Sequence, residues 1–508
     1  MASSECVRCH PKQVQGYLET GMGRSISRNF GQPPVAFTHD FSATKFSVSA
    51  TRSGMRQRVE RDGFFTERDM DYVIGSGNSA FGYLVVSGGH IFQSPLSYYT
   101  RKSIWSLAPG FENNRHPEFE RPVTAECLWC HSGRPRPLVN SVNRFQTPIF
   151  ENEAISCDRC HGPVERHLEN PSASTIVNPA RLPPSARDSV CEQCHLSGEA
   201  RILNPGRTFD NFQPGMELQD VFSVYVYEAS AGAGRFKVVS HVEQLAASRC
   251  AEASQPRIWC GTCHNPHVKP ANALPYYRQR CLSCHAGSLD RKHASQTGCI
   301  SCHMPQRRPF DGGHAAFTDH RIVRRPLEPG EPAAAEKIRA WDKLRAWREP
   351  SSELSARNLG LAYANIGIKN QSAQQADAGL RLLTQSMKSF PQDPEIPGRL
   401  GELLLLKGKS ELALELFQYA AGLQPGFPPR HAAVADAASA AAKPLEAAAA
   451  FERAIELDPL YEPAYRGLAK LHADSGRPDL ARQTWQRYLQ KAPGSIFAQQ
   501  ALARLAPK

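Results

Sequence analysis

The most regular pattern of apolar and polar positions lies in the last third of the chain. Four prolines there recur at one constant spacing, as Pro391, Pro425, Pro459 and Pro493. Before the last three prolines, small residues recur at a distance of 24 and aromatic residues at a distance of eight: Gly401, Ala435, Ala469 and Phe417, Phe451, Trp485. Crossing helices require small and large residues at fixed positions of this kind. The pattern therefore predicts pairs of helices that repeat with the period of the prolines.

A period of about 34 residues with two helices per unit is that of tetratricopeptide repeats. We expect about four repeats over residues 351–508, the first with about seven extra residues between its helices. Such repeats stack into a solenoid whose concave surface commonly docks partner proteins. His431 and His472 lie in this array and are interpreted as structural residues, because nothing else in the array forms a site.

Strand patterns fill residues 35–125. Two β-rich stretches, 81–86 and 90–97, flank Ser87-Gly88-Gly89, which predicts a hairpin. Residues 45–51 and 64–67 are weaker strand candidates. We also expect a short helix over 14–25 and a second hairpin over 221–227 and 236–239. Residues 326–350 are predicted to join two domains, as a proline-rich linker followed by an amphipathic helix at 333–348 that carries Trp341, Leu344 and Trp347.

Seven Cys-x-x-Cys-His units use fourteen of the fifteen cysteines. We number them units 1 to 7 in chain order: Cys6/Cys9/His10, Cys127/Cys130/His131, Cys157/Cys160/His161, Cys191/Cys194/His195, Cys260/Cys263/His264, Cys281/Cys284/His285 and Cys299/Cys302/His303. This spacing is the attachment signature of a c-type haem: the thiols bind the vinyl groups on one porphyrin edge, and the imidazole binds the iron. Cys-x-x-Cys pairs also hold zinc or form disulfides. Because a histidine follows the second cysteine in all seven units, we predict seven covalently attached haems.

Short, proline-rich segments join the units and leave little room for a core of side chains. A haem is a large apolar body, so haem packing is expected to replace much of that core. The predicted fold is a multihaem cytochrome c domain over residues 1–325, mostly irregular and α-helical with a small β subdomain at 35–125. An all-α tetratricopeptide-repeat solenoid follows it at 351–508.

The formal charge of +11 is consistent with such a cofactor load. Each haem brings two propionates, so we interpret the basic excess as propionate partners and expect no nucleic-acid binding. The sequence holds no run of about 18 apolar residues, so no transmembrane helix is expected. Thioether attachment takes place outside the cytosol, yet Met-Ala-Ser-Ser-Glu precedes Cys6 without the features of a signal peptide. We expect that a secretion signal was trimmed or missed, and that the protein is periplasmic or extracellular.

The sixth coordination position of each iron decides between electron transfer and catalysis. Nine histidines of the stretch 1–325 lie outside the units, enough to cap seven irons. His167 follows His161 by six residues, and His267 follows His264 by three, too close to cap the same haem but well placed to reach a neighbouring one. His293 precedes unit 7 by six residues and is interpreted in the same way.

Several motifs give the first three-fifths of the chain a resemblance to the multihaem c-type cytochromes related to the tetrahaem cytochrome of ammonia oxidisers and to octahaem hydroxylamine oxidoreductases. They include Thr20-Gly21-Met22, Tyr72-Val-Ile-Gly75-Ser-Gly77, Cys157-x-x-Cys160-His161-Gly162-Pro163, Cys260-x-x-Cys263-His264-Asn-Pro-His267, Cys299-x-x-Cys302-His303-Met304-Pro305 and Phe317-Thr-Asp-His320-Arg-Ile. The resemblance implies distal ligands at His39, His167, His241, His267, His293, His314 and His320. His90, His116 and Met22 rank lower.

The first hypothesis is a secreted heptahaem cytochrome with mostly bis-histidine haems that passes electrons to redox partner proteins, with its repeats docking a partner. The second is an oxidoreductase with one open haem that acts on nitrite, hydroxylamine or a sulfur oxyanion. It is weakened because the sequence has no Cys-x-x-Cys-Lys unit and no strong case for a cross-linked tyrosine. The third is a subunit of a polymeric extracellular conduit.

Cys250, the remaining cysteine, is interpreted as a small buried residue.

Overall fold

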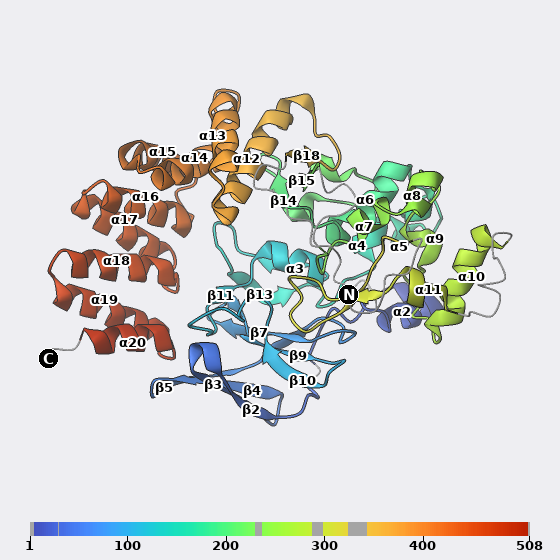
Figure 1. Cartoon of the computed structure of the whole chain (residues 1–508), viewed down its shortest axis with the longest axis horizontal. Coiled ribbons are helices and arrows are strands. Elements are labelled where there is room, and N and C mark those ends of the chain that lie inside the picture. The colour runs from blue at the N-terminus through green and yellow to red at the C-terminus, as the bar shows by residue number, and fades with distance from the viewer. Residues whose placement is uncertain (1–4, 29, 229–235, 287–297, 324–342, 506–508) are drawn as a thin grey trace.

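The computed structural model describes residues 5–28, 30–228, 236–286, 298–323 and 343–505 (Figure 1). Antiparallel sheets and short helices make up the N-terminal part of the chain. A curved stack of helices makes up the C-terminal part. The predicted positions Trp341 and His293 lie outside the described residues.

Two antiparallel sheets account for most of the predicted β subdomain. The first is a four-stranded meander of β2 (Val35–His39), β3 (Thr44–Ala50), β4 (Met55–Arg61) and β5 (Phe64–Asp69). The second has the order β1 (Ile26–Ser27), β6 (Tyr72–Ile74), β7 (Gly82–Ser87), β8 (His90–Gln93) and β11 (Arg121–Pro122). A separate pair, β9 (Leu96–Tyr99) and β10 (Ile104–Leu107), packs with them around Phe46, Val59, Tyr83 and Trp105. Strands at 45–51 and 64–67 are thus confirmed within one or two residues.

The hairpin predicted around Gly88 and Gly89 is also confirmed. Strands β7 and β8 pair in register from Leu84 opposite Gln93 to Ser87 opposite His90. Both glycines have positive φ, 56° and 81°, as a two-residue turn that follows the twist of its strands requires. The helix predicted over 14–25 is α2, which spans Pro11–Leu18, begins at a proline and ends earlier than expected.

Short helices carry most of the cysteine units. Units 2 to 7 lie on or beside helices α3 (Ala125–His131), α4 (Asp158–His161), α6 (Pro184–His195), α9 (Cys260–Cys263), α10 (Ala273–His285) and α11 (Cys299–His303). Between them lie α5 (Glu165–Glu169), α7 (His241–Ala246), α8 (Arg249–Ser254) and the short strand pairs β12 (Pro135–Pro137) with β13 (Phe145–Phe150) and β16 (Gln306–Arg307) with β17 (Phe317–Thr318). In each case the histidine is the last residue of the helix or follows it directly.

The second predicted hairpin, 221–227 with 236–239, is wrong. Strand β15 (Phe222–Tyr227) pairs instead with β14 (Ala200–Leu203) on one side and β18 (Leu344–Ala346) on the other. All six side chains of β15 are buried, so the strand is covered on both faces and has hydrogen-bonding neighbours at both edges. Residues 236–239 form no strand.

The amphipathic helix predicted over 333–348 is also wrong in its described part, because Leu344–Ala346 form strand β18. Leu344 and Ala346 are buried in one cluster with Tyr225, Tyr227 and Leu361. The end of the predicted linker at 326–350 is therefore part of a sheet, and it links that sheet to the first repeat helix.

The C-terminal part is a solenoid of four helix pairs and a final helix. The helices are α12 (Ser352–Asn370), α13 (Ala373–Ser386), α14 (Glu395–Leu406), α15 (Ser410–Leu423), α16 (Pro428–Ala440), α17 (Pro444–Leu457), α18 (Glu462–Asp474), α19 (Pro478–Lys491) and α20 (Ile496–Arg504). Four repeats are confirmed. The extra residues of the first repeat lengthen α12 to 19 residues and do not separate the helices, since only residues 371–372 connect α12 to α13.

The turns between repeats face the N-terminal part of the chain. Asp458 bonds to His90 beside the β7–β8 turn, and the backbone N–H of Ile496 donates to Glu118 at 3.0 Å. A Cβ built on Gly426 would lie 2.9 Å from the Asn140 amide nitrogen. At the other end, α12 packs on the β14-β15-β18 sheet. The solenoid is therefore attached to the rest of the chain at both ends and along one edge (Figure 1).

Candidate functional site

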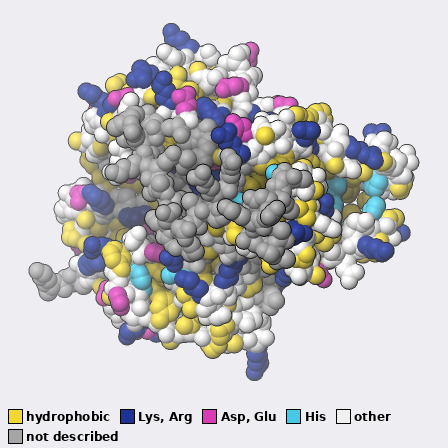
Figure 2. All heavy atoms as spheres, turned by 45° about the vertical axis from the view of Figure 1, so that its right-hand side comes forward, with side chains coloured by type: hydrophobic (Ala, Val, Ile, Leu, Met, Phe, Trp, Pro, Cys, Tyr) yellow, Lys and Arg dark blue, Asp and Glu magenta, His cyan; other side chains and the backbone are white. Residues whose placement is uncertain are grey.

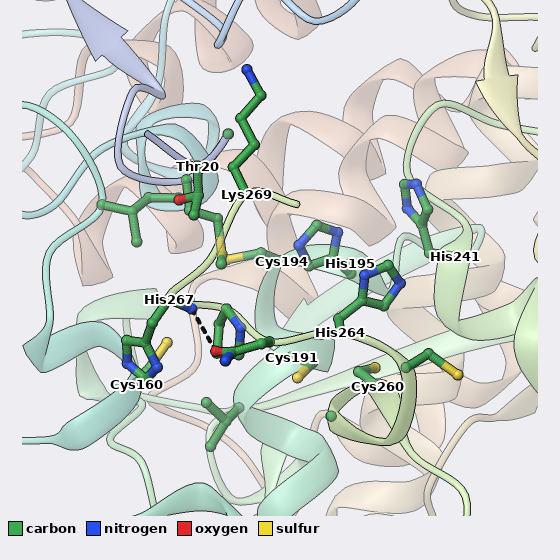
Figure 3. Close-up of a pocket in the computed structure, with 18 of the residues that line it drawn as sticks. Thr20, Cys160, Cys191, Cys194, His195, His241, Cys260, His264, His267 and Lys269 are labelled. Atoms are coloured by element: carbon green, nitrogen blue, oxygen red, sulfur yellow. Dashed lines mark hydrogen bonds between the residues drawn. The ribbon is translucent and has the colours of Figure 1, made fainter. Parts of the chain in front are cut away.

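One large cavity of about 2890 Å³ lies in the N-terminal part, and its lining includes every cysteine and histidine of all seven units. The units are widely separated in sequence, so the fold brings them together. Figure 3 shows His195, His241 and His264 around one part of the cavity and His267 beside Cys160. Seven pairs of thiols and seven imidazoles thus face a common space.

Units 2, 3 and 4 are packed together through their spacer residues. The second spacer of each unit is Trp129, Arg159 and Gln193, which are only 4%, 6% and 2% exposed. The Arg159 guanidinium lies 3.2 Å from the centroid of the Trp129 ring and donates to the Trp129 carbonyl and the Gln193 amide oxygen, both at 3.0 Å. Gln193 donates back to the Arg159 carbonyl at 3.1 Å. Nothing in the sequence indicated this triad, since spacer positions are variable in the attachment signature.

The sulfurs of neighbouring units also come close to one another. A hydrogen bond with Cys194 of unit 4 lowers the pKa of Cys130 of unit 2 to about 6. A hydrogen bond with Cys260 of unit 5 raises the pKa of Cys191 of unit 4. Units 2, 4 and 5 therefore follow one another along the cavity. All fifteen cysteines lie in the described part of the chain, and no disulfide joins them.

In two of the unit histidines, a hydrogen bond shows which ring nitrogen carries the proton. His161 Nδ1 lies 2.8 Å from the Val177 carbonyl oxygen, and His303 Nδ1 lies 2.7 Å from that of Val323. A carbonyl only accepts, so the proton is on Nδ1, and Nε2 is the ring nitrogen with the lone pair that a metal needs.

Two distal candidates show the same arrangement. His320 Nδ1 donates to the Thr318 carbonyl at 2.9 Å, and His167 Nδ1 donates to the Ser172 carbonyl at 3.2 Å. His241 and His267 line the cavity as well. Burial lowers the pKa of His241 to about 3, which favours the neutral form that binds metals.

Three unit histidines have a distal candidate close by, with ring planes inclined to each other by 18° to 32°. The ring centroids of His10 and His167 are 6.4 Å apart with an interplanar angle of 18°. For His161 and His267 the values are 5.8 Å and 20°, and for His264 and His320 they are 6.1 Å and 32°. Because a metal–imidazole bond is about 2 Å long, two imidazoles on opposite sides of one metal ion have centroids roughly 6 Å apart.

Other distal candidates lie away from the cavity. His39 does not line it, and its Nδ1 is 2.8 Å from the Ser42 hydroxyl. His314 Nδ1 accepts from Arg308 and its Nε2 bonds to Ser106, each at 3.1 Å, so both ring nitrogens are engaged outside the lining. These two assignments therefore lack the geometry that the resemblance implied.

The three lower-ranked candidates also differ from one another. Met22 lines the cavity. His90 is buried against Asp458 of the solenoid, and His116 stacks edge-on to Phe497 of α20. Both of these histidines therefore belong to the contact between the N-terminal part and the repeats.

The charges around the cavity are predominantly positive. Its described lining has nine cationic side chains: Arg8, Arg101, Arg121, Arg159, Arg249, Arg257, Lys269, Arg278 and Arg280. It has a single carboxylate, that of Glu5. Within the described residues only Arg249 of these nine forms an ion pair, with Glu252. The lining thus combines thiol pairs, imidazoles, apolar surface and an excess of cations, which are the groups that a covalently attached haem with its propionates requires.

Other possible sites are absent from the described residues. No group of three or more His, Cys, Asp or Glu side chains there is placed to hold a metal ion by itself. Within the same residues, none of the helices has the length and apolar character needed to span a bilayer.

Comparisons with known proteins identify the C-terminal part. Tetratricopeptide repeat models match residues 371–428 and 438–505, which confirms the repeats. No curated protein matches the chain. Similar solved structures include a MamA protein, with 23% identity over 29% of this chain and 80% of that one and a TM-score of 0.25. The Cut9-Hcn1 hetero-tetramer of the APC/C has 18% identity over 30% of this chain and 32% of that one, with a TM-score of 0.26. The thermophilic TPR protein TTC0263 of Thermus thermophilus has 22% identity over 29% of this chain and 80% of that one, with a TM-score of 0.24.

Proposed function

We propose that this protein is a multihaem c-type cytochrome that carries seven haems and transfers electrons. The observation that supports the proposal most strongly is that all seven Cys-x-x-Cys-His units line one cavity. Units that bound zinc separately would have no reason to share a space. When bound, haems in such a cavity would pass electrons between neighbouring irons, and the chain's own part is to attach, ligate and align them.

The paired imidazoles suggest how part of the relay is built. The pairs His10 with His167, His161 with His267 and His264 with His320 would hold the haems of units 1, 3 and 5. The ligand His167 lies six residues after His161, and His267 lies three residues after His264. Each short segment would therefore supply a ligand to two neighbouring haems, which would hold units 1, 3 and 5 in sequence.

Location and partners follow from the same chemistry. Haem attachment to paired cysteines takes place outside the cytosol, so we place the protein in the periplasm or outside the cell. On the face shown in Figure 2, histidines are visible beside Lys and Arg side chains, so the histidine-rich region reaches the surface, where a redox partner would exchange electrons. The repeats would dock a partner protein on their concave surface, as solenoids commonly do.

The decisive experiment is to produce the protein with an added secretion signal in a host that matures c-type cytochromes. Intact mass and pyridine haemochrome spectra then count the covalent haems, and seven are expected. The Cys157→Ala/Cys160→Ala variant should carry six. A protein that emerges without covalent haem but with stoichiometric zinc would contradict the proposal.

The second candidate is an oxidoreductase with an open haem, and one observation favours it. Only four of the seven distal histidine candidates line the described cavity: His167, His241, His267 and His320. With His314 engaged elsewhere, at least one iron depends on another ligand or on substrate. Low-temperature electron paramagnetic resonance with spin counting tests this, because an open ferric haem is high-spin. Nitrite, hydroxylamine and sulfur oxyanions are the substrates to screen.

The third candidate is a subunit of a polymeric conduit. Mass measurement at increasing protein concentration tests it, since a conduit would grow in mass while a monomeric carrier would not.

A further inference from the structure

We infer that Arg159 is a positioning residue shared by units 2, 3 and 4, and that its buried charge raises the reduction potential of the haems held there. The inference rests on the proposed function. It starts from the triad in which Arg159 joins the spacer of its own unit to Trp129 and Gln193 in the spacers of the other two.

The geometry makes Arg159 a three-way connector. Its Nη2 donates to both neighbouring units at 3.0 Å, and its guanidinium plane covers the indole of Trp129. Gln193 also donates to the Val190 carbonyl at 2.9 Å, which fixes that side chain to helix α6. The planar guanidinium stacks on the indole while one of its nitrogens donates to both oxygens, and the ammonium of lysine has no plane to stack in this way. Loss of Arg159 therefore removes the contacts that hold the three units at their observed spacing.

The charge of Arg159 is buried and is not compensated by an ion pair within the described residues. The side chain is only 6% exposed, its partners are a carbonyl, an amide and an aromatic ring, and its Nη1 has no hydrogen-bond partner there. By contrast Asp158, the first spacer of the same unit, pairs with Arg134 at 2.7 Å. Arg159 also lines the cavity, so its field acts on the cofactor space through a medium of low dielectric constant.

The direction of the effect follows from charge. A ferric haem carries one more positive charge than a ferrous haem, so a fixed cation nearby disfavours oxidation and raises the potential. Neutralising Arg159 should lower the potentials of the haems at units 2, 3 and 4, and should leave those of the other units unchanged.

The test compares Arg159→Met, Arg159→Lys and the control Arg207→Gln in haem-loaded protein. Arg207 is exposed and does not line the cavity, so solvent screens its charge. In spectroelectrochemical titrations we expect Arg159→Met to move part of the absorbance change to lower potential. Arg159→Lys should move it less, and Arg207→Gln should match the wild type. A wild-type titration curve for Arg159→Met would overturn the inference.

Haem counting keeps the test decisive if Arg159→Met is poorly assembled. Proteolytic digestion and mass spectrometry then report haem on each unit separately. Loss confined to units 2, 3 and 4 supports the positioning role, whereas equal loss from all seven units overturns it. A wild-type protein without any haem would contradict the proposed function itself, and this is seen before any variant is compared.

Discussion

His90 and Asp458 lie 368 residues apart in the chain and form a buried contact, with His90 Nε2 at 3.0 and 3.1 Å from the two carboxylate oxygens. The other ring nitrogen of His90 lies 3.3 Å from the Gly88 carbonyl. The contact joins the β7–β8 hairpin turn to the turn between the third and fourth repeats. The turn that contains Pro459, one of the four periodic prolines, thus makes one of the contacts that attach the solenoid to the N-terminal part.

Replacing Asp458 with alanine should loosen this attachment. The variant leaves the His90 ring buried without its acceptor, which costs about 1–3 kcal/mol of the free energy of unfolding. Urea unfolding followed by tryptophan fluorescence measures the loss. Asp479→Ala is the matched control, because Asp479 forms an exposed ion pair with Arg482 within α19 and such pairs contribute less than about 1 kcal/mol. Equal effects of the two variants would contradict the structural role of the contact.

Gly401 should not tolerate a larger side chain. A Cβ built at this position on α14 would lie 2.7 Å from the ring of Phe417 on α15, which is closer than atoms can approach without movement. Gly401→Val should therefore lower the free energy of unfolding of the solenoid by about 1–3 kcal/mol. Gly422→Val is a suitable control, since a Cβ at Gly422 in α15 meets nothing within 4 Å and the change there replaces only one poor helix former with another. Thermal unfolding by circular dichroism compares the two variants.

His472 should make the solenoid less stable in acid. Burial, and secondarily the charge of Arg477, lower the pKa of His472 below its ordinary 6.5. Below pH 6.5 the unfolded chain therefore binds a proton that the folded chain resists, so the stability from this residue is present above pH 6.5 and is lost as the pH falls toward the folded pKa. His472→Gln should flatten the fall in melting temperature between pH 7 and pH 5. His431→Gln, in the neighbouring repeat, is the control, and a slope unchanged by His472→Gln would contradict the prediction.

Periodic and local features of the fold could be predicted from the sequence. The constant spacing of the prolines predicts the repeats because each repeat is built mainly from contacts within itself and with its next neighbour. The Gly88-Gly89 pair predicts the hairpin because its turn needs two residues of positive φ. The strands at 45–51 and 64–67 could be predicted from the local pattern of their side chains alone. The cysteine units could be recognised because five residues contain the whole signal.

Features that depend on distant contacts could not be predicted. Leu344 has the apolar spacing of a helix position, but its neighbour is Tyr227, whose strand lies far earlier in the chain. The Arg159, Trp129 and Gln193 triad is formed by variable spacer residues of three units. His39 and His314 were expected to be ligands because of the resemblance, and only the positions of Ser42 and Ser106 show that their rings are engaged elsewhere.

His320 and His314 lie six residues apart, and both were expected as distal ligands. The difference between their surroundings shows that closeness in sequence does not place both in the cavity. His320 lines the cavity with its Nδ1 proton held by the Thr318 carbonyl, so its Nε2 is free to bind iron. His314 has Arg308 on Nδ1 and Ser106 on Nε2. In the haem-loaded ferric protein, His320→Ala should therefore convert one iron of seven from low-spin to high-spin, and His314→Ala should leave the spin count unchanged. Low-temperature electron paramagnetic resonance measures both. If His314→Ala also produced a high-spin iron, the ring would have to leave Ser106 when the cofactor binds, and the case for an open haem would lose the observation that supports it.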